Sequence, residues 1–371
     1  TCTISGTPTA ETSNTTYTVT ANISNVTYQG SVWFSTSTFG TITSAVEGAA
    51  LNLGEAMTPI TLNYTVNANA PSGSSGSSSS TSFVYGNNKI SMGFKHICGI
   101  LDNGSMKCWG NNAHGQLGNG GYGAYSTPVT ATLVDLGTGR TAVAVTAGGH
   151  HTCAILDNGE LKCWGRNDDG QVGIGVTTPL VNGNRGVPSP SSVNLGTRRT
   201  AVAVSAGHYH TCAILDNGDL KCWGEDAYGT LGDGSTTVYP AVLNAPSSTP
   251  VDLGTGRTAV SVSSGAKNTC AILDNGDLKC WGYNAHGQLG IASTTNLFAP
   301  SSTAIDLGTG RTAVDVSVGM DHTCAILDNG DIKCWGRDNF GQLGDGGSTN
   351  TDTNAPSSTA IDLGTGRTAV A

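Results

Sequence analysis

The stretch CAILDNGDLKCWG, from Cys212 to Gly224, decides the fold of this chain. Nearly identical copies begin at Cys153, Cys270 and Cys324, and a looser copy, CGILDNGSMKCWG, begins at Cys98. The tryptophans of the five copies lie 54 to 59 residues apart. A unit that returns at such a period indicates a repeat architecture, in which each unit buries its core against its neighbours.

Each copy predicts a β-hairpin. In the copy that begins at Cys153, Ala154–Leu156 is an apolar strand and Asp157–Gly159 is a three-residue turn, in which the glycine supplies a left-handed residue. This loop length places Cys153 opposite Cys163 at a non-hydrogen-bonded position, where a disulfide forms with little strain. Nine residues between the cysteines do not suit a zinc knuckle. Buried free thiols are the alternative, and we predict these disulfides: Cys98–Cys108, Cys153–Cys163, Cys212–Cys222, Cys270–Cys280 and Cys324–Cys334.

Composition narrows the functional class. The chain has 371 residues, enough for two domains, and its 53 glycines with only 12% charged residues are typical of an all-β protein with many tight turns. A net charge of −9 gives no electrostatic footprint for nucleic acid. No apolar run approaches the roughly 20 residues of a membrane span. No catalytic or phosphate-binding motif is present, so we expect neither an enzyme nor a cofactor.

Cysteine usage and glycosylation sequons indicate an extracellular or cell-surface protein. Ten of the eleven cysteines are in spaced pairs, which suits an oxidising compartment. Cys2 is left over, and we expect it to bond to another chain, to pair with a segment that was removed, or to stay free. Candidate N-glycosylation sites are Asn14, Asn22, Asn25, Asn63 and Asn103.

Residues 1–70 predict a small β-sandwich, because β-branched and polar residues alternate at 16–20, 31–34 and 60–66. The phrase ISGTPT at Ile4–Thr9 resembles the immunoglobulin-like repeats of large prokaryotic surface proteins, where it falls in the second half of a domain. The resemblance implies a prokaryotic source and an incomplete sandwich, completed by strands outside this chain or by another subunit. Residues 71–82, rich in serine and glycine, predict a flexible linker.

Residues 83–371 predict about four short strands per repeat, which is one propeller blade. Each tryptophan is followed by a phrase like WGYNAHGQLG, at residues 281–290, then by a variable loop and a segment like DLGTGRTAV, at residues 252–260. This order resembles the regulator of chromosome condensation family of β-propellers over residues 88–371. That family usually has seven blades, and five repeats is the main departure. A closed five-bladed ring, a part of a longer array and an open array completed by neighbouring subunits all remain open.

Repeated histidines and acidic loops are the candidate ligand groups, and for each we favour a structural role. Four histidines precede a hairpin cysteine by two residues, but the fourth repeat has Asn268 there, so we expect a repeated hydrogen bond and no metal; they are His96, His151, His210 and His322. The acidic loops suit calcium only loosely and are expected to be solvated; they are Asp168–Asp169 and Asp345–Asp352. Other histidines are expected to be solvated in loops: His114, His150, His208 and His286. A lysine precedes the second cysteine of each hairpin and is expected to protect an exposed edge.

Two functions follow. The first is a non-enzymatic extracellular structural or adhesive protein, such as a self-assembling surface filament subunit that exchanges strands between copies. The alternative is a secreted propeller that binds a protein partner through variable loops such as Ile174–Pro190 and Asp233–Pro250, as the β-lactamase inhibitory proteins of this fold suggest. Expected partners are further copies of this chain, or a surface protein or glycan. The acidity and the cysteine pairs disfavour the nucleotide-exchange activity of the nuclear members of the family.

Overall fold

The computed structural model describes the backbone of residues 15–23, 26–36 and 42–45, and residues 89–370 except 122, 124, 178–185, 190, 237–241 and 347–350. The chain divides into two units, residues 1–78 and 79–371. Within the described residues every regular element is a β-strand. No helix there is long and apolar enough to cross a membrane.

The N-terminal unit contains a three-stranded antiparallel sheet in the order β1-β2-β3. The strands are β1 (Thr15–Ile23), β2 (Val26–Thr36) and β3 (Ile42–Ala45). The first two contain the strands predicted at 16–20 and 31–34, which are therefore confirmed. The strand predicted at 60–66, the linker at 71–82 and Cys2 lie outside the described residues, and the immunoglobulin-like sandwich stays a prediction.

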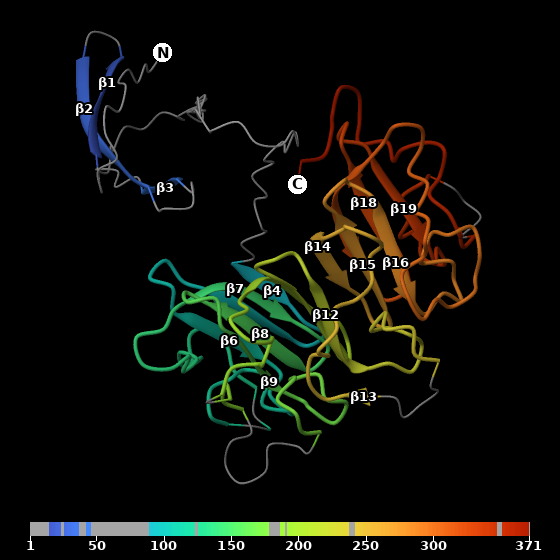
Figure 1. The fold of residues 1–371 in the computed structure, drawn as a ribbon, viewed down its shortest axis with the longest axis horizontal. Coiled ribbons are helices and arrows are strands. Elements are labelled where there is room, and N and C mark those ends of the chain that lie inside the picture. The colour runs from blue at the N-terminus through green and yellow to red at the C-terminus, as the bar shows by residue number, and fades with distance from the viewer. Residues whose placement is uncertain are drawn as a thin grey trace, which may run out of the picture. The chain divides into compact units, whose positions relative to one another are not determined.

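The second unit consists of five small antiparallel sheets, one for each repeat, which follow one another along the chain (Figure 1). We call them blades 1 to 5. Blade 1 comprises β4 (Ile90–Met92), β5 (His96–Ile100) and β6 (Met106–Gly110), and blade 2 comprises β7 (Ala142–Ala147), β8 (His151–Leu156) and β9 (Leu161–Gly165). Blade 3 comprises β10 (Ala201–Ala206), β11 (His210–Leu215), β12 (Leu220–Glu225) and β13 (Val242–Leu243). Blade 4 comprises β14 (Ala259–Ser264), β15 (Asn268–Leu273) and β16 (Leu278–Gly282), and blade 5 comprises β17 (Ala313–Val318), β18 (His322–Leu327) and β19 (Ile332–Gly336).

Within the part of the chain that the structure describes, the predicted fourth strand forms in blade 3 alone, as β13. In blades 1, 4 and 5 the corresponding chain makes an isolated bridge to the end of the third strand, at Gly110–Ser126, Gly282–Leu297 and Gly336–Thr353, and blade 1 has a second bridge at Lys107–Leu133. The loops that precede this position differ in length and sequence between repeats. The outer edge of a blade therefore carries less regular pairing than the hairpin, whose sequence is nearly constant.

The hairpins have the predicted register. Cys153 lies opposite Cys163, and the amide of Leu156 donates to the carbonyl of Glu160 at 2.8 Å. Gly159, at the third turn position, has φ of 77°, the left-handed conformation that the turn requires. All five predicted cysteine pairs are bonded in the structure, each with its two Cα atoms 4.0–4.1 Å apart.

The hydrophobic core lies between blades. Four clusters of buried side chains each join one blade to the next, and in each cluster the cysteines of the earlier blade pack with the tryptophan of the later one. The inner strands approach so closely that a Cβ added to Gly148 would lie 2.4 Å from the carbonyl oxygen of Gly207 in the next blade. The ends of the first strands of all five blades, with the turns that follow them, line a central cavity of about 250 Å³. This is the arrangement of a β-propeller.

Two predictions about repeated side chains have different outcomes. The predicted repeated hydrogen bond is confirmed for three of the four histidines: Nε2 of His96, His151 and His210 lies 2.8–2.9 Å from a threonine hydroxyl of the next blade. His322, in the last blade, makes no such contact within the described residues. The lysine prediction is wrong for four of five repeats, since Lys162, Lys221, Lys279 and Lys333 are at most 8% exposed. The DLGTG-like segment that precedes each blade covers the lysine of that blade. Lys221, for example, donates to the carbonyl of Leu195 at 3.0 Å.

Candidate functional site

One face of the propeller carries the residues in which the repeats differ. It is built from the turns between the first two strands of each blade and from the loops that follow the third strand. The two are joined by backbone hydrogen bonds of 2.8–3.0 Å, such as those from Arg166 to His150 and from Glu225 to Tyr209. We call this the variable face. The residue pairs in its turns are Phe94–Lys95, Gly149–His150, His208–Tyr209, Ala266–Lys267 and Met320–Asp321.

The opposite face is nearly the same in every repeat. There the hairpin turn of a blade meets the GTGRT-like segment that precedes the blade's own first strand. Arginine–aspartate ion pairs of 3.0–3.2 Å recur at this position: Arg140–Asp157, Arg199–Asp216, Arg257–Asp274 and Arg311–Asp328. We call this the uniform face. A structural scaffold explains such repetition, whereas it does not explain the diversity of the variable face.

Aromatic and imidazole rings from three blades gather on the variable face. Phe94 of blade 1 lies 5.9 Å from the ring of His150 and 5.6 Å from that of His208, measured between ring centroids. His150 and His208 lie 5.7 Å apart, and His208 stacks on Tyr209 at 4.2 Å. His114 lies 4.9 Å from His150. The prediction that these histidines are simply solvated is wrong, because the curvature of the propeller brings their turns together.

Burial sets the charge of this cluster. Burial and then the positive charges of neighbours such as His114 and Arg166 together lower the pKa of His150 to about 4. Burial and Arg166 also lower the pKa of His208, against the opposing charge of Asp169. Both imidazoles are therefore neutral at pH 7. Among the described residues, Nδ1 of His150 and Nε2 of His208 are buried without a hydrogen-bond partner.

Cations and exposed apolar groups surround the cluster. Lys95 lies 5.2 Å from the ring centroid of Phe94, and Arg166 lies 5.1 Å from that of Tyr209. Phe94 is 57% exposed although it belongs to this packed group. Exposed aromatic rings flanked by arginine or lysine are typical of the energetically dominant residues in protein interfaces.

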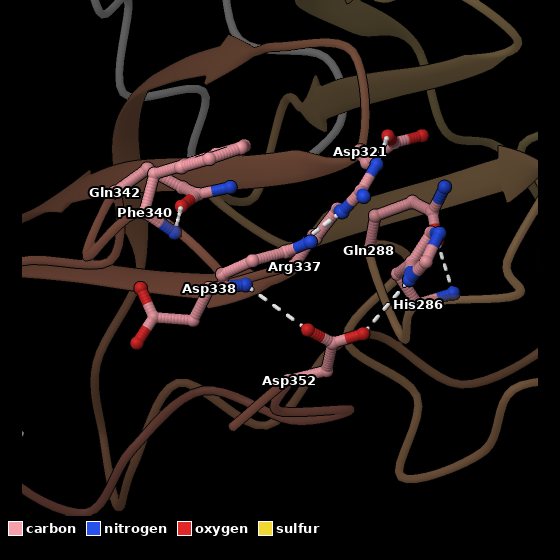
Figure 2. Close-up of polar contacts among 9 residues, drawn as sticks. His286, Gln288, Asp321, Arg337, Asp338, Phe340, Gln342 and Asp352 are labelled. Carbon is pink, nitrogen blue, oxygen red and sulfur yellow. Dashed lines mark hydrogen bonds and ion pairs between the residues drawn. The ribbon is translucent and has the colours of Figure 1, made fainter. Parts of the chain in front are cut away.

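A second hollow lies on the loops between blades 4 and 5, beside the contact of His286 with Asp352 that Figure 2 shows. It has a volume of about 520 Å³, and its walls include His286 and Asp352, whose side chains are 2.7 Å apart. Burial opposes ionisation of Asp352, but hydrogen bonds from His286 and from the amide of Asp338 hold its pKa below the usual value. His286, predicted to be solvated, is thus tied to the next blade. Phe340 stands nearby and is 88% exposed.

The acidic loops form no metal site among the described residues. Asp168 and Asp169 pair with Arg166 at 3.1 and 3.5 Å. Residues 347–350 of the second acidic loop lie outside the described residues. Of the sequons, Asn103 lies exposed in the hairpin turn of blade 1 and Asn22 lies in β1, while Asn14, Asn25 and Asn63 lie outside the described residues. Sequence reasoning missed the ring cluster, although the contrast between constant and varied positions pointed to this face.

The five repeated blades and their packing around a centre define a β-propeller with one uniform and one variable face. The family model for the RCC1-like domain matches residues 62–371, and the chain belongs to this family. The Ultraviolet-B receptor UVR8 of Arabidopsis thaliana is 31% identical over 270 residues, which are 72% of this chain and 56% of the receptor. The mitochondrial RCC1 domain-containing protein RUG3 of the same plant is 30% identical, over 69% of this chain and 55% of its own length.

Solved structures agree on the fold. Human WBSCR16 matches with a TM-score of 0.62 at 21% identity, over 74% of this chain and 66% of that chain. Yeast RCC1 (Prp20) bound to Kap60 matches with a TM-score of 0.60 at 19% identity, over 72% and 59%. The chain spans about half the length of the two curated plant relatives. The four relatives named here are eukaryotic, and the prokaryotic source stays a prediction.

Proposed function

We propose that this protein is a non-enzymatic extracellular binding propeller that holds a protein partner on its variable face. The observation that carries the proposal is the contrast between the two faces: the scaffold residues repeat almost unchanged, and the variable-face turns differ in every blade. Phe94, His150 and His208 form the proposed centre, since they combine exposed aromatic surface with buried nitrogen atoms that have no partner among the described residues. Five disulfides support the extracellular location.

The test is capture with matched variants. The full chain is immobilised and exposed to the secreted and surface proteins of its source organism, beside Phe94→Asp and the uniform-face variant Arg257→Ala. We expect a partner that Arg257→Ala retains and that Phe94→Asp binds about thirtyfold more weakly or not at all, as for a residue that dominates an interface. A partner retained equally by both variants would place recognition elsewhere and overturn the proposal.

A second candidate function is that of an extracellular structural or adhesive filament subunit. The N-terminal sheet supports it, because β1 and β3 are both edge strands within the described part of that sheet, and edge strands accept strands from other chains. The test is electron microscopy of the native protein. Filaments that disappear when residues 1–70 are deleted are expected, and single dispersed particles of the native protein would overturn this candidate.

A further inference from the structure

The hairpin turns on the uniform face have the same backbone contacts in all five blades. In each turn the glycine carbonyl accepts from the alanine amide that follows the next GTGRT-like segment, as Gly104 accepts from Ala142 at 2.8 Å and Gly218 from Ala259 at 3.0 Å. The asparagine before that glycine is exposed in every blade, so its exposure in the first blade does not depend on the position of that blade. These residues are Asn103, Asn158, Asn217, Asn275 and Asn329.

The residue two positions after this asparagine distinguishes the first turn from the other four. It is serine in blade 1, at Ser105, and acidic in the other blades, at Glu160, Asp219, Asp277 and Asp331. In blades 3, 4 and 5 the side-chain amide of the asparagine donates to this aspartate at 2.8 Å. A carboxylate therefore occupies the amide nitrogen in these three turns.

In blade 1 the side-chain nitrogen of the asparagine is available. The side-chain oxygen of Asn103 accepts from the backbone amide of Ser105 at 3.0 Å and from its hydroxyl at 2.6 Å. Among the described residues, no group accepts a hydrogen bond from Nδ2 of Asn103. The turn thus presents a free amide nitrogen and a hydroxyl group side by side, on an exposed side chain.

This pair of groups has the chemistry of an acceptor for N-linked glycans. Such acceptors are exposed asparagines followed, after one residue other than proline, by serine or threonine. The transfer forms a bond between Nδ2 and the anomeric carbon of a sugar, and it breaks the bond from that carbon to the diphosphate of a lipid-linked donor. The diphosphate leaves with the bonding electrons, and Nδ2 loses one proton. An aspartate or glutamate in place of the serine lacks the hydroxyl group that the acceptor requires.

We propose that Asn103 carries an N-linked glycan, and that the acidic residue at the equivalent position keeps glycans off the other four hairpin turns. The proposal rests on the extracellular location proposed above, because lipid-linked sugar donors modify exported chains. The glycan would stand on the uniform face, whereas Phe94, His150 and His208 lie on the variable face. The glycan therefore leaves the proposed binding centre uncovered.

Mass spectrometry of tryptic peptides from the native protein, and from variants expressed in the source organism, tests the assignment. Cleavage after Lys95 and Lys107 gives a peptide in which Asn103 begins the only sequon. We expect this peptide to carry the added mass of a glycan, which Ser105→Thr retains and which Asn103→Gln and Ser105→Asp lose. A native peptide without added mass would overturn the proposal. So would a glycan that persists in Asn103→Gln, because it would then be attached to Ser105.

The matched gain-of-function variant is Asp219→Ser, which introduces the serine of the first turn into blade 3. The tryptic peptide from Thr200 to Lys221 should then acquire a glycan on Asn217, whereas the control Asp219→Asn should leave that peptide unmodified. An unmodified peptide in Asp219→Ser would refute the role given to the acidic residue.

The state of the cysteines in the native protein separates this proposal from the proposed location. Free thiols together with an unmodified Asn103 would overturn both the extracellular location and the glycan. Bonded cysteines together with an unmodified Asn103 would overturn the glycan alone. Asn103→Gln should bind a variable-face partner as the wild type does, so the partner experiment above does not depend on this one.

Discussion

Replacing Asp226 by asparagine should stabilise this protein at neutral and alkaline pH. Three other repeats have asparagine at this position, and in each of them the amide donates to a loop carbonyl while its oxygen accepts from a backbone amide; Asn284, for example, donates to Ser293 at 2.7 Å and accepts from Leu289 at 2.9 Å. Asp226 is 3% exposed and accepts from Leu231 at 2.9 Å. When ionised, it has no hydrogen to donate.

The pKa of Asp226 is raised to about 7, first by burial and then by the charges of Asp233 and Glu225, against the hydrogen bond from Leu231. The folded state thus keeps a proton that the unfolded state loses near pH 4. Stability should therefore fall as pH rises between about 4 and 7, by at most about 1.4 kcal/mol per pH unit, and level off above that. Over the interval the loss is roughly 2–4 kcal/mol.

Thermal unfolding measured from pH 4 to pH 8 tests this reasoning. Asp226→Asn should match the wild type near pH 4 and unfold at a higher temperature at pH 8, so its pH profile is flatter. The reciprocal variant Asn284→Asp should acquire the wild type's loss of stability with rising pH at a second, equivalent site. Parallel profiles for the wild type and Asp226→Asn would refute the assignment of a buried protonated carboxyl group.

Three further changes test the repeat contacts. His151→Asn should lessen the loss of stability as pH falls below 6.5, because burial lowers the pKa of His151 to about 3 and only the unfolded state binds the proton in that range; thermal unfolding between pH 4 and 7 measures it. Gly173→Ala should lower the melting temperature more than Gly175→Ala, because both glycines have positive φ but only Gly173 packs against a tryptophan ring, that of Trp223. Equal losses would count against a role of this glycine–tryptophan contact in stability. Lys221→Met should cost about 1–3 kcal/mol in denaturant unfolding by leaving a buried carbonyl unpaired, and a neutral effect would contradict that contact.

The hairpins could be predicted from sequence because their determinants are local. A three-residue turn and its glycine fix the register of the strands that flank it, and with it the position of each cysteine. The contacts between repeats could not be predicted in this way. Lys221 looked exposed because strand alternation does not reveal that a segment 26 residues away covers its side. His150 and His208 looked solvated because their proximity depends on how blades are rotated about the centre.

The disulfides join strands within a hairpin and, in the described chain, never one blade to another. Disulfide formation therefore stabilises each hairpin but adds no covalent link between blades. Neighbouring blades are held together by apolar packing and by the contact of a tryptophan in the later blade with a glycine in the earlier one. Under mechanical load, we expect the blades to detach one at a time with every disulfide intact. Each detachment would release the chain of one repeat, except for the short loop that its own disulfide closes. The length of the chain under a pulling force should therefore increase in nearly equal steps.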